Sequence, residues 1–303
     1  MMSEILIRAG CFVAIIAMGF LLRRLGFFKE GDFRVISQIT LKLTLPAAIV
    51  VSFAEISVEP AMLSVAFLAL GGGVLYIAVA FLINLRSSKE LRAFAMLNTS
   101  GYNIGLFALP LVQSSLGPVG VVAASLFDVG NAFVCLGGAY GVASAVKDGS
   151  GFSFKRIGKA LLTSVPFMTY IVMILLNFTG LRLPNAVLSF ADIIRGANTF
   201  MAMLMIGVGF KLEINGSQLR QIFKIVLTRY SIAAIFALAF YYLLPFSLEI
   251  RQTLVLLVFS PIGSATPAFT AEMNSDVGLS SAVSSVCMLC SIVIMTTLMV
   301  VML

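Results

Sequence analysis

Long apolar runs separated by short polar stretches make up almost the whole sequence. Most of these runs reach the roughly 20 residues that an α-helix needs to cross a lipid bilayer. The pattern predicts about ten transmembrane helices, at residues 5–22, 35–54, 61–84, 93–115, 119–146, 160–179, 186–210, 221–244, 252–273 and 277–302. We therefore expect an all-α membrane protein with one transmembrane domain over residues 1–303. The first run is long enough to span, so a membrane helix is expected there rather than a signal peptide.

Two of the predicted helices are interrupted in their own middle. The interrupting residues of run 93–115 are Thr99, Ser100, Gly101, Asn103, Gly105 and Pro110, and those of run 252–273 are Pro261, Gly263, Ser264, Thr266 and Pro267. Backbone groups freed inside a bilayer cost several kcal/mol each unless protein, ions or water satisfy them. Such breaks are typical of discontinuous helices whose unwound centre lines a binding site. Chance is the alternative, because Gly and Pro are common in transmembrane helices.

Basic residues follow most of the odd-numbered helices, whereas the even-numbered loops hold only Arg182 and Arg251. By the positive-inside rule the odd-numbered loops are cytoplasmic, which places both termini outside. Two five-helix sets, residues 1–146 and 160–303, then have opposite orientations and form an inverted repeat, with an interrupted helix fourth in each. The stretch 147–159, which contains Gly and Ser, is predicted to be a flexible cytoplasmic linker between them.

Composition supports a membrane protein and argues against several function classes. Hydrophobic residues make up 60% and charged residues 11% of the 303 positions, and the mean hydropathy is +1.08. The net charge of +7 is spread over short loops, as topology signals are, so we do not expect nucleic-acid binding. The sequence has no histidine, which removes Ser-His-Asp and His-metal sites and leaves carboxylates as the natural proton carriers. Neither a phosphate-binding loop nor a clustered nucleophile and base is present, so neither ATP-driven transport nor an enzyme is expected.

The four cysteines all lie in apolar runs, where free thiols are expected rather than disulfides; they are Cys11, Cys135, Cys287 and Cys290. The Cys287-x-x-Cys290 spacing is a weak redox or zinc signal, because no further cysteine-rich partner exists. We expect no metal site and no cofactor, apart from Na⁺ or H⁺ as a coupling ion.

Asn103 is the strongest candidate for contact with a ligand. Its side chain offers a donor and an acceptor at the unwound centre of the first interrupted helix, so it can bind a carboxylate or help to coordinate a cation. The alternative is that it only satisfies its own broken backbone. Gly105, Pro110 and Pro267 complete the predicted substrate site. Weaker candidates, because helical Ser and Thr often bond the carbonyl one turn back, are Thr99, Ser100, Ser264 and Thr266.

Charged side chains inside the spans need partners, since each costs about 2.5–3.5 kcal/mol near the bilayer centre. Lys42 lies deep in the second predicted helix, too far from its end for easy snorkelling, and is assigned to the substrate site. Asp128 and Asn131 stand three residues apart and can face the same side of their helix. They suit a proton carrier or a sodium site, or equally a structural hydrogen bond between helices.

Three other charged groups have simpler interpretations beside functional ones. Glu272 and Asp276 end the ninth predicted helix, where they either cap the turn or form a cation vestibule, so Glu272 is a third candidate for coupling. Asp192 and Arg195 stand three apart and are expected to pair. Arg229 lies about two turns from the cytoplasmic end of its helix and is expected to snorkel towards the surface.

Three sequence features point to a known family: Asn103-Ile104-Gly105 with Pro110-Leu111, Leu43-Thr44-Leu45-Pro46, and the spacing from Pro261 to Asp276. Together they resemble the auxin efflux carrier family, which includes PIN-like bacterial transporters and plant PIN carriers and is related to the bile acid/sodium symporter superfamily. The resemblance covers essentially the whole chain. It implies ten helices in two inverted five-helix repeats, with helices four and nine crossing at their broken centres. It also implies that helices one, two, six and seven form a scaffold against which the other six move like an elevator.

The resemblance further implies transport of small organic anions, which are auxin in plants and dicarboxylates such as malate or malonate proposed for bacterial members. It matches Asn103 to a substrate-contacting asparagine and Lys42 to a lysine of the plant carriers. This sequence departs from the plant pattern in having no acidic residue in 61–84, Val165 before Pro166, and Met273 in place of a tyrosine. Plant coupling and auxin recognition are therefore not transferred.

These features predict a secondary active transporter of a small organic anion. The N-terminal ends of the half-helices, each with roughly half a positive charge, would attract the anion, and the C-terminal ends would suit a cation. An anion channel or a non-transporting membrane sensor is the alternative. The expected partners are the anion and the lipid bilayer of an inner or plasma membrane. A homodimer is a second possible arrangement beside a monomer.

Overall fold

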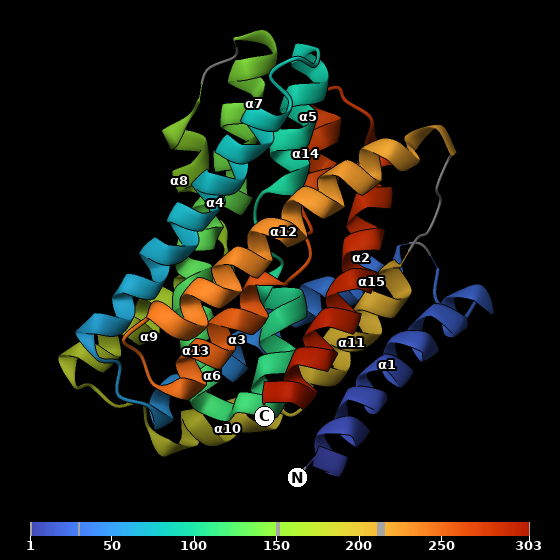
Figure 1. Cartoon of the computed structure of the whole chain (residues 1–303). Helices are drawn as coiled ribbons and strands as arrows, with labels where there is room; N and C mark the ends of the chain where they lie inside the picture. The colour runs from blue at the N-terminus through green and yellow to red at the C-terminus, as the bar shows by residue number, and fades with distance from the viewer. Residues whose placement is uncertain (1, 30, 150–151, 211–215, 303) are drawn as a thin grey trace.

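The computed structural model describes residues 2–29, 31–149, 152–210 and 216–302, and all regular elements in this part are helical (Figure 1). The first half contains α1 (Met2–Arg24), α2 (Asp32–Ile39), η1 (Thr40–Thr44), α3 (Leu45–Glu55), η2 (Pro60–Leu63), α4 (Ser64–Ile83), α5 (Lys89–Thr99), η3 (Ile104–Ala108), α6 (Leu109–Phe133), η4 (Val134–Gly138) and α7 (Ala139–Asp148). The second half contains α8 (Phe154–Thr163), α9 (Val165–Thr179), α10 (Asn185–Arg195), α11 (Asn198–Gly209), η5 (Gly216–Gln218), α12 (Leu219–Leu243), α13 (Leu248–Val258), α14 (Thr266–Glu272) and α15 (Val277–Met302).

Six helical segments in the described residues are long and apolar enough to cross a membrane, and a bent pair of helices would make a seventh. The outer surface agrees with a lipid environment, because large apolar side chains such as Phe67, Phe223 and Val293 are at least 65% exposed. The prediction of an all-helical, multi-pass membrane protein is therefore confirmed.

One of these segments, Lys89–Asp148, contains two of the predicted spans. Its 60 residues would be about 90 Å long as a straight helix, three times the thickness of a bilayer core. The chain instead unwinds at residues 100–103 and turns at Gly117, whose φ of +58° lies in the region that favours glycine. Pro118 follows this turn. The turn falls between the predicted runs 93–115 and 119–146.

The predicted linker 147–159 needs correction, because most of it is helical. Lys147 and Asp148 end α7, and α8 begins at Phe154. The side chain of Ser153 starts α8 by accepting a hydrogen bond from the Arg156 N–H at 3.3 Å. Residues 150–151 of the linker lie outside the described residues. A further bend of 77° separates α8 from α9 at Ser164, where run 160–179 was expected to be continuous.

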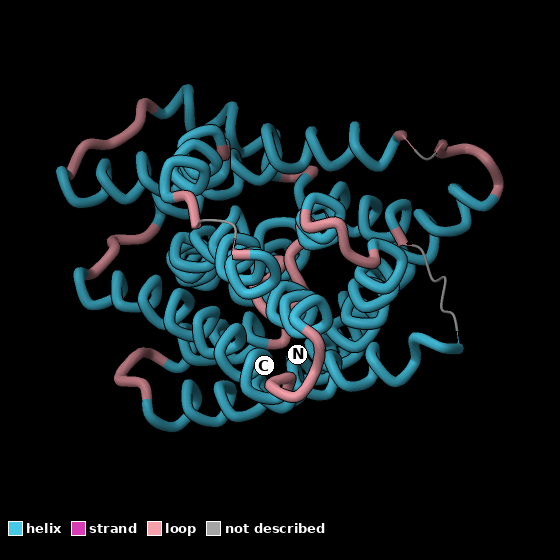
Figure 2. Tube along the Cα trace, turned by 90° about the horizontal axis from the view of Figure 1, so that it is seen from above, coloured by secondary structure: helices cyan, strands magenta, loops and turns pink. Residues whose placement is uncertain are grey.

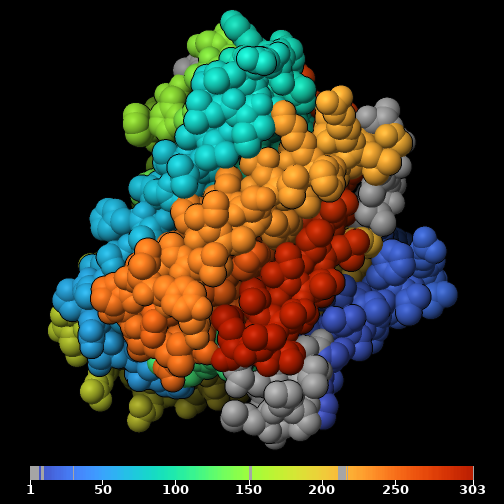
Figure 3. All heavy atoms as spheres, viewed as in Figure 1, coloured from blue at the N-terminus to red at the C-terminus, as the bar shows by residue number. Residues whose placement is uncertain are grey.

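The helices pack as two groups, which meet where α6 contacts α3, α9 and α11 and where α15 contacts α1. In one, α1 packs on α11, α2 on α11, and α3 on α9 and α10; in the other, α4 packs on α5 and α6, α5 on α7, α12 on α13, and α14 on α15. Glycines allow close approach within each group, since a Cβ at Gly207 would lie 2.1 Å from the Ile16 carbonyl and one at Gly130 would lie 1.8 Å from the Ala66 carbonyl. Figure 3 shows α12 running diagonally across one face, between α4 and α5 on one side and α15 on the other.

Candidate functional site

The two interrupted helices touch each other inside the bundle. Residues 100–103 separate α5 from η3, and residues 259–265 separate α13 from α14. The backbone N–H of Asn103 donates to the carbonyl oxygen of Pro261 at 2.9 Å. Seen from above, loop segments pass through the middle of the bundle as well as around its rim (Figure 2). Both breaks that the sequence predicts are therefore present, and they lie in direct contact.

Arg229 of α12 joins the ends of the two half-helices that precede the breaks. Its Nη1 donates to the carbonyl of Thr99, the last residue of α5, at 2.6 Å. Its Nη2 donates to the carbonyls of Ser260 at 2.7 Å and Pro261 at 3.2 Å, just after α13. The side chain is 0% exposed. The expectation that Arg229 snorkels is wrong, because the unpaired carbonyls at the two breaks offer its guanidinium better partners than the membrane surface does.

Two tyrosines enclose the same guanidinium. Its central carbon lies 5.4 Å from the ring centre of Tyr76 and 5.3 Å from that of Tyr102, which is close enough for cation–π attraction. The Tyr76 hydroxyl also donates to the carbonyl of Arg229 at 3.2 Å. These contacts offset part of the cost of burying a positive charge.

Asn131 of α6 holds the first break from its other side. Its Oδ1 accepts from the Tyr102 N–H at 2.9 Å, and its Nδ2 donates to the Tyr102 carbonyl at 2.8 Å. The same Nδ2 donates to Oδ1 of Asp128 at 2.8 Å, so the two residues face the same side of α6. The Asn131 amide is thus occupied by protein groups, and its assignment to a coupling ion stays a prediction.

The Asp128 carboxylate has a second donor from another helix. The hydroxyl of Tyr170 on α9 donates to its Oδ2 at 3.0 Å. The contact links α6 to α9, so the structural interpretation of Asp128 is realised. A role in carrying a proton stays a prediction, and the position of Asp128 on the wall of a cavity is compatible with it.

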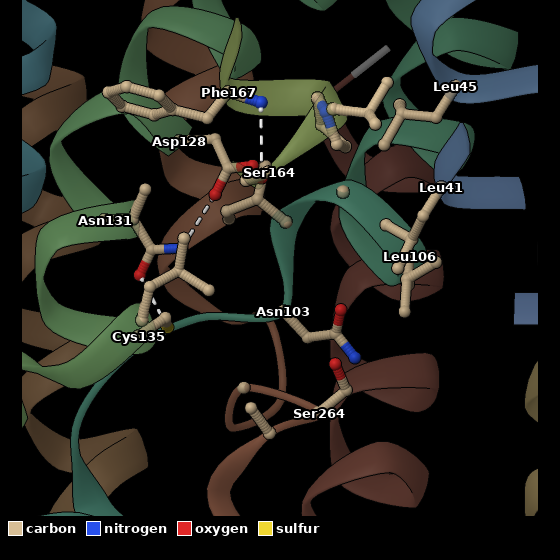
Figure 4. A pocket seen from close by; sticks show the side chains of 18 of the residues that line it. Leu41, Leu45, Asn103, Leu106, Asp128, Asn131, Cys135, Ser164, Phe167 and Ser264 are labelled. Carbon is tan, nitrogen blue, oxygen red and sulfur yellow. Dashed lines mark hydrogen bonds between the residues drawn. The ribbon is translucent and has the colours of Figure 1, made fainter. Parts of the chain in front are cut away.

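A cavity of about 270 Å³ lies against the two breaks (Figure 4). Six of the predicted site residues line it, namely Lys42, Asn103, Gly105, Asp128, Asn131 and Ser264. Ser164 and Phe167, from the bend between α8 and α9, form part of the opposite wall together with Leu41 and Leu45. The lining therefore combines polar groups at the breaks with an apolar wall, as small-molecule sites do.

Asn103 is the polar group best placed to meet a solute. Its backbone N–H binds Pro261, and its carbonyl accepts from the Ala108 N–H at 3.2 Å, so other groups satisfy its broken backbone. The residue is 7% exposed, and its side chain has no hydrogen-bond partner within the described residues. Figure 4 shows the Asn103 amide and the Ser264 hydroxyl turned towards each other.

The other predicted site residues lie outside this cavity. The Ser100 hydroxyl donates to the Met96 carbonyl at 2.9 Å, one turn back, which was the simpler interpretation. The side chain of Glu272 forms an exposed ion pair with Arg156 of α8. The remaining four belong to helix ends or walls beside the breaks and do not line the cavity; they are Thr99, Pro110, Thr266 and Pro267.

Simpler interpretations also hold for two other groups. Asp192 and Arg195 pair at 2.6 Å, as expected. Asp276 caps α15, because its Oδ1 accepts from the Leu279 N–H at 2.8 Å. All four cysteines are free thiols.

The role of Arg229 and the contributions of Tyr102 and Tyr170 were not predictable from the sequence. An arginine inside an apolar run signals a buried partner. The position of Arg229 in the run does not tell which way its side chain points, however. Only the fold shows that the side chain points at the breaks.

Residues 11–145 match the model of a protein family described as "Membrane transport protein". The match includes the first break, Lys42, Asp128 and Asn131. No curated protein matches the chain.

Proposed function

We propose that the protein is a secondary active transporter of a small organic anion, because residues 11–145 match a membrane transport protein family and the sequence resembles the auxin efflux carrier family. The proposed substrates are carboxylates such as malate or malonate, or auxin-like acids. The observation that supports this most directly is the Asn103 side chain. Its amide faces a cavity where two interrupted helices meet and is not used by the described protein groups.

The cavity offers a carboxylate several hydrogen bonds and one charge. The amide of Asn103 and the hydroxyl of Ser264 lie at the breaks, and Lys42, an exposed side chain, lines the cavity as well. A lysine close to a bound carboxylate would supply the attraction that a neutral amide lacks. Leu41 and Leu45, which line the cavity, would contact the carbon skeleton. A volume of about 270 Å³ suits a small metabolite.

We further propose that ten helices form two inverted five-helix repeats with both termini outside, and that transport follows an elevator-type movement. The packing supports such a division, because α1, α2, α3, α9, α10 and α11 contact one another while α4 to α7 and α12 to α15 form the second group. The cavity lies between the two groups, with Leu41 and Phe167 from the first and Asn103 and Ser264 from the second. A shift of one group past the other would carry a solute held at the breaks.

The coupling ion is proposed to be H⁺ or Na⁺. Asp128 is the candidate for proton exchange, since its carboxylate borders the cavity and contacts both groups through Asn131 and Tyr170. Protonation there would weaken its hydrogen bond from Tyr170 and thereby the contact between α6 and α9.

Uptake by purified protein in liposomes tests the proposal. A panel of radiolabelled mono- and dicarboxylates would be supplied with a sodium gradient or a pH gradient, each imposed separately. We expect accumulation of at least one anion above its external concentration. Fluxes that only equilibrate the anion would instead indicate a channel, and no flux of any anion would refute transport.

A further inference from the structure

We infer that the Arg229 guanidinium is a built-in cation that fills the place a coupling sodium ion would otherwise take at the two breaks, so that no sodium ion binds there. The inference rests on the proposed transport function. It assigns Arg229 as a positioning residue, because it acts on the substrate site through the backbone of residues 99 and 260–261.

The charges at this point balance. The half-helices α5 and α13 each have 11 residues and point their C-terminal carbonyl ends at the guanidinium. Each helix end acts like roughly half a negative charge, so the two together amount to about one. One guanidinium neutralises them. A further cation at the same carbonyls would find no negative charge left to neutralise.

The geometry also excludes a small ion. Backbone carbonyls from the C-terminal ends of interrupted helices are the ligands that such sites use to coordinate sodium. Here the carbonyls of Thr99, Ser260 and Pro261 accept from Arg229 at 2.6, 2.7 and 3.2 Å. A planar guanidinium can span the ends of two helices at once, which the single ammonium of a lysine cannot do.

The surroundings of Arg229 indicate that these carbonyls, and not a carboxylate, stabilise its positive charge. In the part of the chain that the structure describes, no carboxylate lies within 4 Å of the guanidinium. The aromatic faces of Tyr76 and Tyr102 lie beside it, and its Nε lacks an acceptor among the described residues. An arginine buried without an acidic partner is costly. The negative ends of α5 and α13 are therefore the groups that stabilise it.

This arrangement reaches the substrate site directly. The Pro261 carbonyl accepts from Arg229 and also from the backbone N–H of Asn103. Tyr102, whose ring lies against the guanidinium, lines the cavity. In a sodium-coupled protein the breaks would become ordered when the ion binds. Here they are ordered by a residue of the chain itself, so the anion should bind equally well with and without sodium.

The experiment measures thermal unfolding and anion uptake of Arg229→Ala, Arg229→Lys and wild type in sodium chloride or N-methylglucamine chloride of equal ionic strength. Millimolar guanidinium chloride is added in a parallel series. For wild type we expect the same Tm and the same uptake in both salts. For Arg229→Ala we expect a Tm lower by several degrees and uptake reduced at least 10-fold. Guanidinium or sodium should partly restore both, because the vacated carbonyls accept a small cation.

The matched control is Arg195→Ala, which removes an arginine from an ion pair at the bundle surface. It should respond to neither cation. Asp128→Asn removes the other group of the cavity that could attract sodium. Sodium dependence of wild-type uptake that persists in Asp128→Asn would overturn the inference.

If Arg229→Ala does not fold, the measurements on wild type and on Arg229→Lys test the inference instead. Arg229→Lys should have a lower Tm than wild type. Its Tm should also respond to sodium or guanidinium, because an ammonium leaves part of the carbonyl cluster open. A folded variant at position 229 whose Tm and uptake equal those of wild type would also overturn the inference. If wild type moves no anion but the cation responses of Tm appear as expected, the transport proposal fails while the built-in cation stands.

Discussion

Asn131 binds the backbone of Tyr102 at both of its polar groups, accepting from the N–H at 2.9 Å and donating to the carbonyl at 2.8 Å. Tyr102 lies in the unwound segment, where neither group has a partner within a helix. A single side chain of α6 therefore pairs with the backbone N–H and carbonyl that a helical turn would pair elsewhere. The shape of the first break depends on that side chain.

Replacing Asn131 by Ala should destabilise the protein and impair the site together. The buried N–H of Tyr102 would lose its partner, and its carbonyl would keep only the weak donor Cys135 Sγ at 3.6 Å, at a cost of about 2–4 kcal/mol. Chemical unfolding in detergent would measure the stability, and equilibrium binding would measure the affinity for the transported anion. Asn177→Ala is the matched control, because Asn177 likewise binds the backbone of Phe53, Ile56 and Val58 but does not line the cavity. This control variant should lower the stability of the protein without lowering its affinity for the anion. Equal effects of both variants on affinity would contradict this role.

Asn103→Ala should affect binding and leave stability nearly unchanged. Its side chain makes no hydrogen bond within the described residues, so its removal leaves no described protein group without a partner. A lost hydrogen bond to a carboxylate costs about 1.5–3 kcal/mol, which is about a 10- to 100-fold loss of affinity. Titration with the anion and uptake in liposomes would measure it. Ser264→Ala, on the other break, should have a smaller effect, since a neutral hydroxyl offers one donor. Undiminished uptake by Asn103→Ala would be evidence against the proposed site.

Asp128→Asn should remove the response of transport to pH if this carboxylate exchanges the coupling proton. The amide keeps the shape of the carboxylate but does not titrate between pH 5 and pH 8. We expect exchange of anion across the membrane to persist, while accumulation driven by a pH gradient is lost. Asp192→Asn is the control, because Asp192 is an exposed partner of Arg195 and does not line the cavity. Uptake by Asp128→Asn that still follows the pH gradient would assign the proton to another group.

Glu272→Gln should shift the balance between conformations and barely change stability. Glu272 of α14 pairs with Arg156 of α8, a helix that contacts η4 and α6 on one side and α9 on the other. Both side chains are more than 40% exposed, so the pair contributes no more than about 1 kcal/mol and weakens with salt. Distance measurements between spin labels on α8 and α14 should show a second population growing in the variant and in high salt. A single unchanged distance would show that the pair does not select a conformation.

Much of the fold follows from the apolar pattern, because a membrane tolerates few alternatives to helices. The positions of both breaks were predictable for the same reason. Gly101, Pro110, Pro261 and Pro267 cannot all continue an apolar helix, and Asn103 marks the point where the first one opens. The sequence therefore located the centre of the candidate site.

The partners at this centre were not predictable. Arg229 satisfies carbonyls of residues 99, 260 and 261, and nothing in the local sequence of α12 indicates them. The helical start of α8 was missed because Gly and Ser in 147–159 suggested a flexible linker. Ser153 caps α8 there through a local hydrogen bond from the Arg156 N–H, which is a role that serines commonly have at helix starts. Contacts between distant segments decided only the case of Arg229.

The Pro261 carbonyl oxygen accepts from two donors that belong to different parts of the chain, the side chain of Arg229 and the backbone of Asn103. Neither break can loosen alone, because movement of either one pulls on that shared oxygen. Opening of the two unwound segments should therefore be concerted. A bound metabolite would meet either the complete set of contacts or none of them, which makes partial, leaky occupancy unfavourable.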